Sequence, residues 1–436
     1  MGRKTIISVI FSLFLIQLFY TCKKDSVNNK QVQPPPVITV TGIKPDAGKH
    51  GDTIIITGTH FNLNAADDTV KFNGKTGVVQ KATADTLFVI VPLGAGSGVV
   101  TVNGITVSGP PFSYTPVAIV STFAGGAAGY LDGPDSLAKF TDPDAICFDP
   151  QGNMYVDDGD YRIRKIAGGM VSTLAGDGGS GYVNGPDSVA EFFFATGIAA
   201  DAHGNVFVAD DEADRLREIS AGMVSTYAGT GAIGNQNGPV STAQFYDPVS
   251  LAFDAQDNLY VVEGDDLRKI SSSGIVTAFA GPTTIGIGSF MDGPDTTARF
   301  NNPIGLALDG QGNVYVADDN NKRIRKITPS GLVSTFAGTG IQGFKDGPAD
   351  SAQFYLLNGV AVDTQGNVYV TDWHCIRKIT PGGVVSLFTG TYTPGFADGP
   401  AATALFHFPV GLAFDAVGNL YVADANNTRI RKITFE

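Results

Sequence analysis

The sequence predicts an all-β protein in which a small β-sandwich is followed by a six-bladed β-propeller. Residues 37–115 alternate apolar and polar residues between Gly, Asn and Asp turns, as half-buried strands do. Downstream, a phrase of the type RIRKI recurs six times at intervals of 51 to 57 residues, each copy ending at an isoleucine: Ile166, Ile219, Ile270, Ile327, Ile379 and Ile433. Repeats of this length, with four short strands each and no helical periodicity, are typical of propeller blades.

Composition limits the function classes. The chain has 436 residues, of which 43% are hydrophobic and 16% charged, so it can build a sizeable core. The formal net charge of −13 argues against a nucleic-acid partner, because phosphate backbones attract basic surfaces. Three cysteines are too few and too scattered for a disulfide framework.

The N-terminus reads as an export signal. Arg3 and Lys4 precede an uncharged, mostly apolar run over residues 6–20, which is short for a membrane span but right for a signal peptide. Cys22 follows directly, and the arrangement resembles a bacterial lipoprotein cleavage site. We therefore expect a signal peptide over 1–21, lipidation at Cys22 and a tether over 22–36 that ends in three prolines. The alternative is an ordinary export signal with a chance cysteine.

The resemblance implies a location. A lipid anchor at Cys22 would hold the protein at the outer membrane or the cell surface, and the periplasm is the alternative. The anchor would make the membrane one partner, and an outer-membrane uptake complex would be another.

The first folded unit is expected over residues 37–115. Its predicted strands are 53–58, 69–74, 86–92 and 98–104. The order of these segments resembles the immunoglobulin-like IPT/TIG domain. Its lysines (Lys44, Lys49, Lys71, Lys75, Lys81) are balanced by aspartates (Asp46, Asp52, Asp67, Asp68, Asp85), so a spacer role fits better than DNA binding.

The second unit is expected over residues 117–436. One copy reads NPIGLALDGQGNVYVADDNNKRIRKI and resembles an NHL repeat, which implies a six-bladed NHL-type propeller. We name the four strands of a blade a to d from the axis outward. Each of the six d segments can be found, but one of them, 119–124, precedes every a–b–c set, and the last set has no d segment after it. We therefore expect 119–124 to close the ring as the outer strand of the last blade.

Small residues are expected along the axis, where the sheets converge. One alanine per copy was assigned to a shared register of strand a: Ala145, Ala199, Ala252, Ala307, Ala361 and Ala413.

The connections between strands b and c begin with an acidic residue and are rich in Asp and Asn. In four copies an arginine (Arg162, Arg215, Arg323, Arg429) follows the first aspartate (Asp158, Asp210, Asp318, Asp424) by four or five residues. We expect each Asp to cap its turn and to pair with that arginine. Glu263 in blade 3 and Cys375 in blade 5 depart from this pattern. Ca²⁺ binding by these turns stays open as an alternative, and no other cofactor is expected.

Candidate ligand-binding residues lie where the d–a and b–c connections meet at one mouth of the axial channel. The residues just before or at the start of strand a vary from blade to blade, and so does the b–c turn that carries the one tryptophan. The candidates are Trp373, Tyr355, Tyr246, Phe193, His407, Asp142, Asp144, Asp247, Asn302 and Asn358. For Trp373, ligand contact and local packing stay open. The aromatic residues before the DGP or NGP turns (Tyr130, Tyr182, Phe290, Phe344, Phe396) are interpreted as mainly structural.

These residue types predict sugar binding. Aromatic rings stack on the C–H faces of sugars, while carboxylates and amides hydrogen-bond to sugar hydroxyls. The predicted function is a cell-surface lipoprotein that binds an extracellular ligand, an oligosaccharide, at the propeller mouth. One alternative is an enzyme of lyase or lactonase type, with Asp142, Asp144, Asp247 and His407 as a carboxylate site. The other is a protein–protein interaction scaffold. The five histidines do not supply a three-His zinc site.

Overall fold

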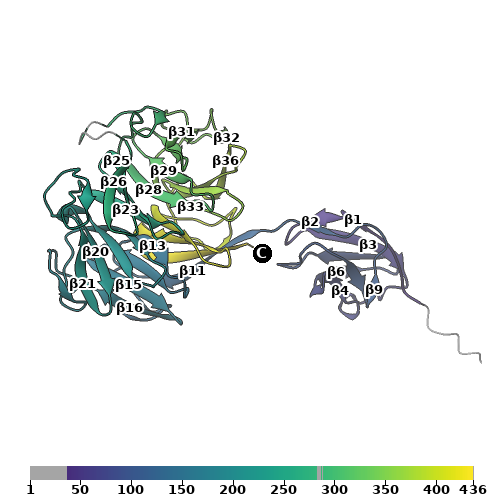
Figure 1. The fold of residues 1–436 in the computed structure, drawn as a ribbon. Helices are drawn as coiled ribbons and strands as arrows, with labels where there is room; N and C mark the ends of the chain where they lie inside the picture. The colour runs from purple at the N-terminus through teal and green to yellow at the C-terminus, as the bar shows by residue number, and fades with distance from the viewer. Residues whose placement is uncertain (1–36, 282–285, 287, 436) are drawn as a thin grey trace, which may run out of the picture.

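The computed structural model of the protein describes residues 37–281, 286 and 288–435. The predicted signal peptide, Cys22 and the tether lie outside the described residues. Within the described part of the chain, helix is limited to three 3₁₀ turns: η1 (Ala65–Asp67), η2 (Asp211–Ala213) and η3 (Ala425–Asn427). No helix found there has the length and apolar character needed to cross a bilayer. Two β units, joined at residues 115–118, make up the molecule (Figure 1).

The first unit is the predicted sandwich. One sheet has the strand order β1–β3–β7–β6, the other has β5–β4–β8–β9, and β2 pairs with β10 in parallel. The strands are β1 (Thr39–Lys44), β2 (Ala47–Gly48), β3 (Thr53–Thr59), β4 (Val70–Phe72), β5 (Lys75–Thr76), β6 (Val78–Ala82), β7 (Thr86–Ile90), β8 (Val100–Val102), β9 (Ile105–Thr106) and β10 (Ser113–Tyr114). Alternate residues of each strand face the core and the solvent. In β3, for example, Ile54 and Ile56 are buried, whereas Thr53 and Ile55 are exposed.

The second unit is a propeller of six five-stranded sheets. Blade 1 holds β12 (Gly133–Pro134), β13 (Pro143–Phe148), β14 (Met154–Asp158), β15 (Arg162–Ala167) and β16 (Met170–Ala175). Blade 2 holds β17 (Gly185–Pro186), β18 (Ala195–Ala200), β19 (Val206–Asp210), β20 (Arg215–Ser220) and β21 (Met223–Ala228). Blade 3 holds β22 (Gly238–Pro239), β23 (Pro248–Phe253), β24 (Leu259–Glu263), β25 (Asp266–Ile270) and β26 (Ile275–Ala280).

The remaining blades repeat this plan. Blade 4 holds β27 (Gly293–Pro294), β28 (Pro303–Leu308), β29 (Val314–Asp318), β30 (Arg323–Ile327) and β31 (Leu332–Ala337). Blade 5 holds β32 (Gly347–Pro348), β33 (Leu357–Val362), β34 (Val368–Asp372), β35 (Cys375–Ile379) and β36 (Val384–Gly390). Blade 6 holds β37 (Gly399–Pro400), β38 (Pro409–Phe414), β39 (Leu420–Asp424), β40 (Arg429–Phe435) and β11 (Ala118–Gly125).

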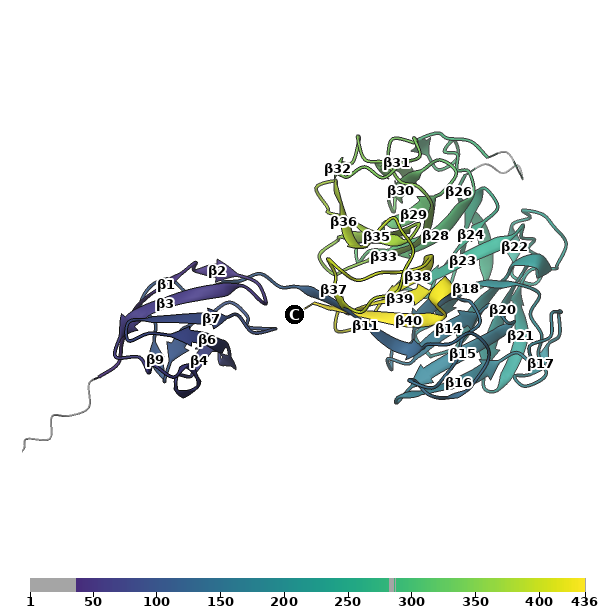
Figure 2. The ribbon, with the colours of Figure 1, turned by 180° about the vertical axis from the view of Figure 1, so that it is seen from behind.

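The ring closes as predicted. Strand β11, which precedes every other propeller strand, pairs antiparallel with the last strand, β40, from Ala118–Phe435 to Gly125–Arg429 (Figure 2). The chain enters β11 at the Ala118 end, next to Phe435, whereas the b–c turn of blade 6 lies at the opposite end of β40. The sandwich is therefore attached on the side of the propeller away from the predicted mouth.

The sequence did not predict a fifth strand in each blade. The Gly-Pro pair of every DGP or NGP turn forms a two-residue strand along strand d, as in the pairing of Gly133 with Val171. These short strands lie at the outer edge of the sheets, where they cover the edge that strand d would otherwise expose.

The register of strand a differs from the prediction in blade 1. In the other five blades the named alanine pairs with an aromatic residue of strand b, as Ala199 does with Phe207, but in blade 1 that partner, Tyr155, pairs with Cys147. Ala145 lies two positions earlier, in register with Gly411 of blade 6. A Cβ atom on Gly411 would lie 2.5 Å from the carbonyl oxygen of Asp144, so the closest approach of the inner strands occurs in this register.

A buried arginine–carboxylate pair repeats in every blade, and it is not the predicted pair. Asp158 pairs with Arg164 at 2.8 Å instead of with Arg162, and the other five blades follow, with distances of 2.6 to 3.0 Å. The other carboxylate oxygen accepts backbone N–H groups at the start of strand a, as from Thr141. Blades 3 and 5 share this pair through Glu263 and Asp372, so these residues act as the internal frame of the blades.

Candidate functional site

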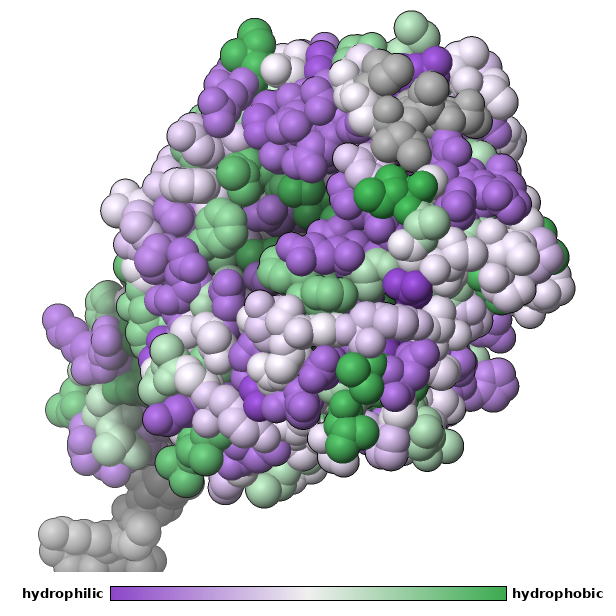
Figure 3. Space-filling model, turned by 90° about the vertical axis from the view of Figure 1, so that its left-hand side faces the viewer, coloured by the Kyte–Doolittle hydropathy of each residue, from purple (hydrophilic) through white to green (hydrophobic). Residues whose placement is uncertain are grey.

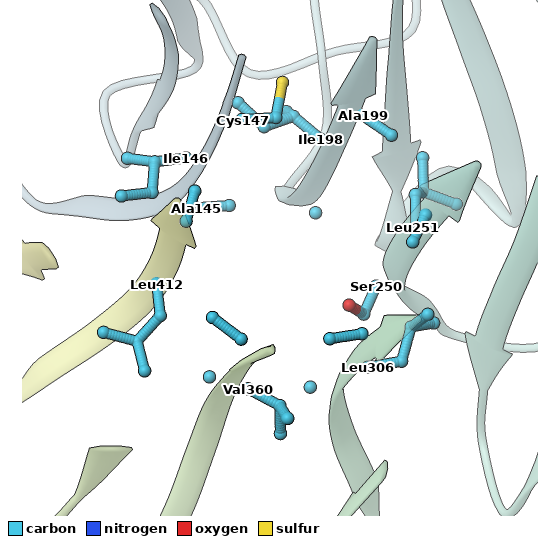
Figure 4. Close-up of a pocket in the computed structure, with 18 of the residues that line it drawn as sticks. Ala145, Ile146, Cys147, Ile198, Ala199, Ser250, Leu251, Leu306, Val360 and Leu412 are labelled. Carbon is cyan, nitrogen blue, oxygen red and sulfur yellow. The ribbon is translucent and has the colours of Figure 1, made fainter. Parts of the chain in front are cut away.

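The six inner strands surround a cavity on the propeller axis. Its volume is about 400 Å³, and every blade contributes residues of strand a to its wall. Figure 4 shows side chains such as Ile198, Leu251, Leu306, Val360 and Leu412 arranged around an open centre. Asp144 and Asn358 are the acidic and amide residues of this wall, and Asn358 is buried with no hydrogen-bond partner for its Nδ2 atom.

One mouth of this cavity carries the variable loops. The b–c turns and the d–a connections lie together there, since the first residues of strand a bond to the end of strand b in each blade. Seen from the side opposite to the sandwich, the propeller is hollowed near its centre, with hydrophobic residues in the hollow and hydrophilic ones around it (Figure 3). The predicted candidates are all at this face, where acidic residues of blades 1 to 3 and aromatic residues of blades 5 and 6 form separate groups.

Blade 1 contributes the first part of an acidic half. Asp142 is exposed, and Asp144 lies deeper, at the cavity wall. Burial raises the pKa of Asp144 to about 7, and the charges of Asp142 and Asp158 add to this effect. Asp157 lies close to them in β14, and burial raises its pKa well above the usual range.

Blades 2 and 3 continue the acidic half. Asp211, Asp214 and Asp247 lie close together, and Asp214 accepts the backbone N–H of Asp247 at 3.3 Å. Burial, followed by the charges of Asp247 and Asp214, raises the pKa of Asp211 to about 7. Tyr246 stands beside Asp247, and the charge of this aspartate raises the pKa of its phenol.

In blade 4 the aspartate equivalent to Asp211 has a cation and a backbone N–H as partners. Asp319 follows Asp318 as Asp211 follows Asp210, and its Oδ1 atom accepts the N–H of Leu357 and the ammonium of Lys322, both at 2.8 Å. Asp211 of blade 2 has neither of these partners. The residue equivalent to Leu357 is Pro248 at the start of strand a of blade 3, which has no N–H, and the residue equivalent to Lys322 is Asp214. Asp211 therefore keeps a buried oxygen without a partner.

In four of the six blades, an aromatic ring and an arginine are linked. In blades 1, 2, 4 and 6 the first residue of strand c is an arginine whose guanidinium covers the aromatic ring before the DGP or NGP turn, at 3.9 to 4.1 Å from the ring centroid. The pairs are Arg162–Tyr130, Arg215–Tyr182, Arg323–Phe290 and Arg429–Phe396. The structural interpretation of these aromatic rings is thus supported in four blades.

Blade 5 breaks this link and keeps the ring. Cys375 occupies the arginine position, opposite Asp372 in the ladder, and among the described residues no guanidinium covers Phe344. Tyr392 stacks on Phe344 instead, at 3.7 Å between centroids, and Tyr355 stacks on it at 4.9 Å. Tyr392 is 38% exposed. Tyr392 was not among the predicted residues, and Phe344 was interpreted as mainly structural, although the loss of the arginine beside a retained aromatic residue was a usable signal.

Trp373 extends this aromatic group and holds an unusual backbone conformation. Its ring lies 5.3 Å from that of Tyr355 and 5.9 Å from that of Phe408. Its φ angle is 62°, in a two-residue turn whose counterpart in blade 3 uses Gly264 at φ 42°. The left-handed conformation costs a non-glycine residue about 1 kcal/mol or more. The b–c turns of the other blades also contain one left-handed residue each, namely Tyr161, Asp214, Gly264, Lys322 and Thr428, so this conformation belongs to the turn. Trp373 differs from these residues by its contacts with other aromatic rings.

Two histidines border the aromatic group. His374 is buried, and its Nδ1 atom accepts the backbone N–H of Phe408 at 3.0 Å, which joins blade 5 to blade 6. Burial lowers the pKa of His374, and His407, whose ring centroid is 5.4 Å away, adds to this effect. We define the aromatic platform as Phe344, Tyr355, Trp373, Tyr392 and Phe408, with His407 at its edge.

The other predicted residues lie apart from the platform. Phe193 is 39% exposed in blade 2, and Asn302 is exposed in blade 4, where its N–H bonds to Asp265. Asp142, Asp144 and Asp247 come from blades 1 and 3, whereas His407 belongs to blade 6 and contacts His374 of blade 5. Within the described ranges, no group of three or more His, Cys, Asp or Glu side chains is arranged to hold a metal ion.

Comparison with known proteins agrees with this architecture. The family model of the IPT/TIG domain matches residues 38–115, and the model of the NHL repeat matches residues 300–327. The chain carries an IPT/TIG domain and an NHL repeat. The residues matched by the NHL model run from Phe300 to the end of β30, so they span strands a to c of blade 4.

Solved structures share the whole two-unit fold. A Bacteroides thetaiotaomicron protein of unknown function has 22% sequence identity and a TM-score of 0.60, and covers 93% of this chain and 99% of its own. An auxiliary nutrient binding protein from Bacteroides ovatus has 17% identity and a TM-score of 0.64, with the same coverage. These likenesses show a common fold over both units of the chain.

Two curated relatives are much longer than this chain. Protein SUPPRESSOR OF QUENCHING 1 of Arabidopsis thaliana is 29% identical over 276 residues, which is 58% of this chain and 26% of that protein. Teneurin-3 of Mus musculus is 25% identical over 354 residues, or 70% of this chain and 13% of that protein. The chain thus spans about a quarter or less of the length of these relatives.

Proposed function

We propose that this protein binds an extracellular oligosaccharide on the aromatic platform of blades 5 and 6. The observation that carries the proposal is the environment of Phe344, which lacks the arginine found over the corresponding ring in four other blades. In four blades the corresponding ring is covered by an arginine, whereas in blade 5 it is part of a partly exposed stack with Tyr355 and Tyr392.

The geometry of the platform suits a sugar ring. Stacked aromatic faces offer an apolar surface with a negative quadrupole, which favours the C–H groups of a pyranose. Polar groups at the edge can bond to hydroxyls, namely the His407 imidazole and the Gln342 amide, whose Nε2 atom already bonds to the Tyr355 carbonyl. A partly exposed aromatic group of this kind on a rigid frame is typical of a ligand site.

The place of the protein in the cell belongs to the same proposal. The relative from Bacteroides ovatus that shares the two-unit fold is described as an auxiliary nutrient binding protein, which supports a nutrient ligand here. With lipidation at Cys22, the IPT/TIG domain would act as a spacer that holds the mouth away from the outer membrane. An outer-membrane uptake complex would then receive the glycan.

The test is a glycan array followed by calorimetry on the full chain. We expect Trp373→Gly to lower the affinity for the selected oligosaccharide at least about tenfold, equivalent to 1.4 kcal/mol. Glycine suits the φ angle of 62°, so the variant should fold. Tyr161→Gly is the matched control, because Tyr161 is an aromatic residue at φ 65° in the b–c turn of blade 1. Equal loss in both variants, or no loss in Trp373→Gly, would refute the platform.

A further inference from the structure

Asp157 of blade 1 is an acidic residue at a position where the other blades have alanine, valine or threonine. Its side chain is 1% exposed, and neither carboxylate oxygen has a hydrogen-bond partner. The same register of strand b holds Ala209, Val262, Ala317, Thr371 and Ala423 in the other blades. The internal frame does not need a carboxylate here, so Asp157 calls for an explanation of its own.

Thr371 of blade 5 shows what surrounds this position. Its hydroxyl accepts the N–H of Gly359 at 2.8 Å and donates to the carbonyl of Val410 at 3.0 Å, so it bridges the inner strands of two neighbouring blades. Blade 1 has the same bulge as blade 5 at the start of strand a. The residues equivalent to Gly359 and Val410 are therefore Ala145 of blade 1 and Thr196 of blade 2.

A carboxylate in this position meets further acceptors. From its equivalence with Thr371 we expect it to approach the carbonyl group of Thr196. Asp144 is its foremost charged neighbour, followed by Asp158, Asp160 and Asp142. Arg164 does not compensate for it, because both terminal nitrogens of that guanidinium are used by Asp158, Asp132 and two carbonyls. Oxygen ligands that gather without a donor are what a hard cation requires.

We propose that Asp157 and Asp144 bind a divalent cation of the Ca²⁺ type between blades 1 and 2, at the wall of the axial cavity. The carbonyl of Thr196 would be a third oxygen ligand, and water from the cavity would complete the shell. Ca²⁺ accepts six to eight oxygens in irregular geometry, including backbone carbonyls, whereas Mg²⁺ needs near-octahedral geometry. This site differs from the b–c turns, whose first aspartates are used by the frame arginines.

The bound ion would have a structural consequence. It would link the inner strand of blade 1 to that of blade 2, as the Thr371 hydroxyl links blade 5 to blade 6. It would also place positive charge beside Asp142 and Asp144 at the mouth, and thus make the acidic half less repulsive to an anionic group. The inference is independent of the oligosaccharide site.

The experiment is a Ca²⁺ titration of the full chain after EDTA treatment, followed by calorimetry and thermal unfolding. We expect one Ca²⁺ whose binding raises Tm by about 5 °C at saturating concentration. Asp157→Asn should abolish that binding event and the Tm shift, and Asp144→Asn should weaken binding at least tenfold. Asp350→Asn, an exposed carboxylate in the loop before β33, should bind as the parent does.

Two outcomes would overturn the proposal. The parent protein could show no Ca²⁺-dependent heat or Tm shift, while Asp157→Asn melts higher than the parent because an amide replaces a buried carboxyl group; Asp157 would then carry a proton and no ion. Alternatively, Asp157→Asn could bind Ca²⁺ as tightly as the parent, which would place the ion elsewhere. Unchanged circular dichroism of the asparagine variants confirms that each comparison concerns folded protein.

Discussion

Blades 1 and 5 share one frame and differ in what stands on it. Both hold the buried arginine–carboxylate pair, Arg164–Asp158 and Arg377–Asp372, and both have the same bulge in strand a. Five positions near the mouth differ, however, and at three of them an acidic residue of blade 1 corresponds to a neutral residue of blade 5. The corresponding pairs are Thr141 and Tyr355, Asp142 and Leu356, Asp144 and Asn358, Asp157 and Thr371, and Arg162 and Cys375.

The difference separates structural from functional residues within one chain. A residue that recurs in all blades is needed to build a blade, whereas a residue that departs from the repeat must be explained by its own surroundings. By this criterion the frame aspartates are structural, and the aromatic platform of blade 5 and Asp157 of blade 1 are candidates for function. The two halves of the mouth thus carry different side chains on the same frame of buried arginine–carboxylate pairs.

The largest expected effect comes from opening the ring where the two halves meet. Deletion of residues 117–125 removes β11 and exposes the edge of β40 in blade 6. We expect the propeller to melt more than about 10 °C lower, as measured by Trp373 fluorescence. Removal of the sandwich, residues 37–115, is the control and should leave the propeller transition nearly unchanged. An unchanged melting temperature after deletion of 117–125 would contradict ring closure by β11.

A second pair of variants tests whether the buried arginine–carboxylate pair contributes equally to stability in blades 1 and 5. Arg164→Ala and Arg377→Ala each leave a buried aspartate without its partner, and we expect each to lower the free energy of unfolding by about 3–5 kcal/mol. Denaturant titration of both variants measures this. If only one of the two substitutions destabilised the protein, the frame would not be common to both blades.

The acidic half should carry a pH dependence that blade 4 lacks. Asp211 has a folded-state pKa of about 7, above the value near 4 of an unfolded carboxyl group, so the folded state binds the extra proton between these values. Its contribution to stability is present below about pH 4 and is lost as the pH rises to about 7. Asp211→Asn should therefore be about 1–2 kcal/mol more stable than the parent at pH 8, and nearly equal to it at pH 4.

Asp319→Asn of blade 4 is the matched control for that prediction. Asp319 has the Leu357 N–H and the Lys322 ammonium as partners, so the same substitution should destabilise the protein at pH 8. Thermal unfolding at pH 4 and pH 8 distinguishes the two variants. Stabilisation by Asp319→Asn at pH 8 would show that the two blades do not differ in the way described.

A smaller effect separates two phenylalanines in equivalent positions. Phe290→Ala removes the ring beneath Arg323 and should lower stability by about 1 kcal/mol without changing oligosaccharide affinity. Phe344→Ala should lower that affinity about tenfold, because Tyr355 and Tyr392 lose the ring on which they stack. Calorimetry and thermal unfolding of both variants are needed. Loss of affinity in Phe290→Ala would place ligand contacts outside blade 5.

Much of the fold was predictable because the repeat exposes it. Six copies of one phrase indicated six blades, and the misplaced segment 119–124 indicated how the ring closes. The fifth strands were not predicted, because a two-residue Gly-Pro strand has no alternation to recognise. The alanine register failed in blade 1, where Cys147 is the small residue that pairs with Tyr155.

The site was predicted only in part, for physical reasons. Trp373 and Tyr355 were identified because they vary between blades, but Tyr392 lies in a d–a connection whose path no local pattern fixes. Spacing favoured Arg162 as the partner of Asp158, yet the buried pair is formed by Arg164. Arg162 lies two residues earlier on the same face of β15, and it bonds instead to Asp160 and to the carbonyl of Asp177. Asp157 was not among the predicted candidates, because the sequence does not show that the end of β14 is buried without a partner for this side chain.

The central claim is that the aromatic platform of blade 5 binds a sugar, and the chain supplies its own probe. Trp373 is the one tryptophan of the sequence, so intrinsic fluorescence excited at the indole reports on the platform alone. We predict that an oligosaccharide selected on the array shifts or quenches this emission in a saturable way, with the same midpoint as in calorimetry. Calorimetric binding that leaves the Trp373 emission unchanged would contradict the platform and place the ligand elsewhere on the protein.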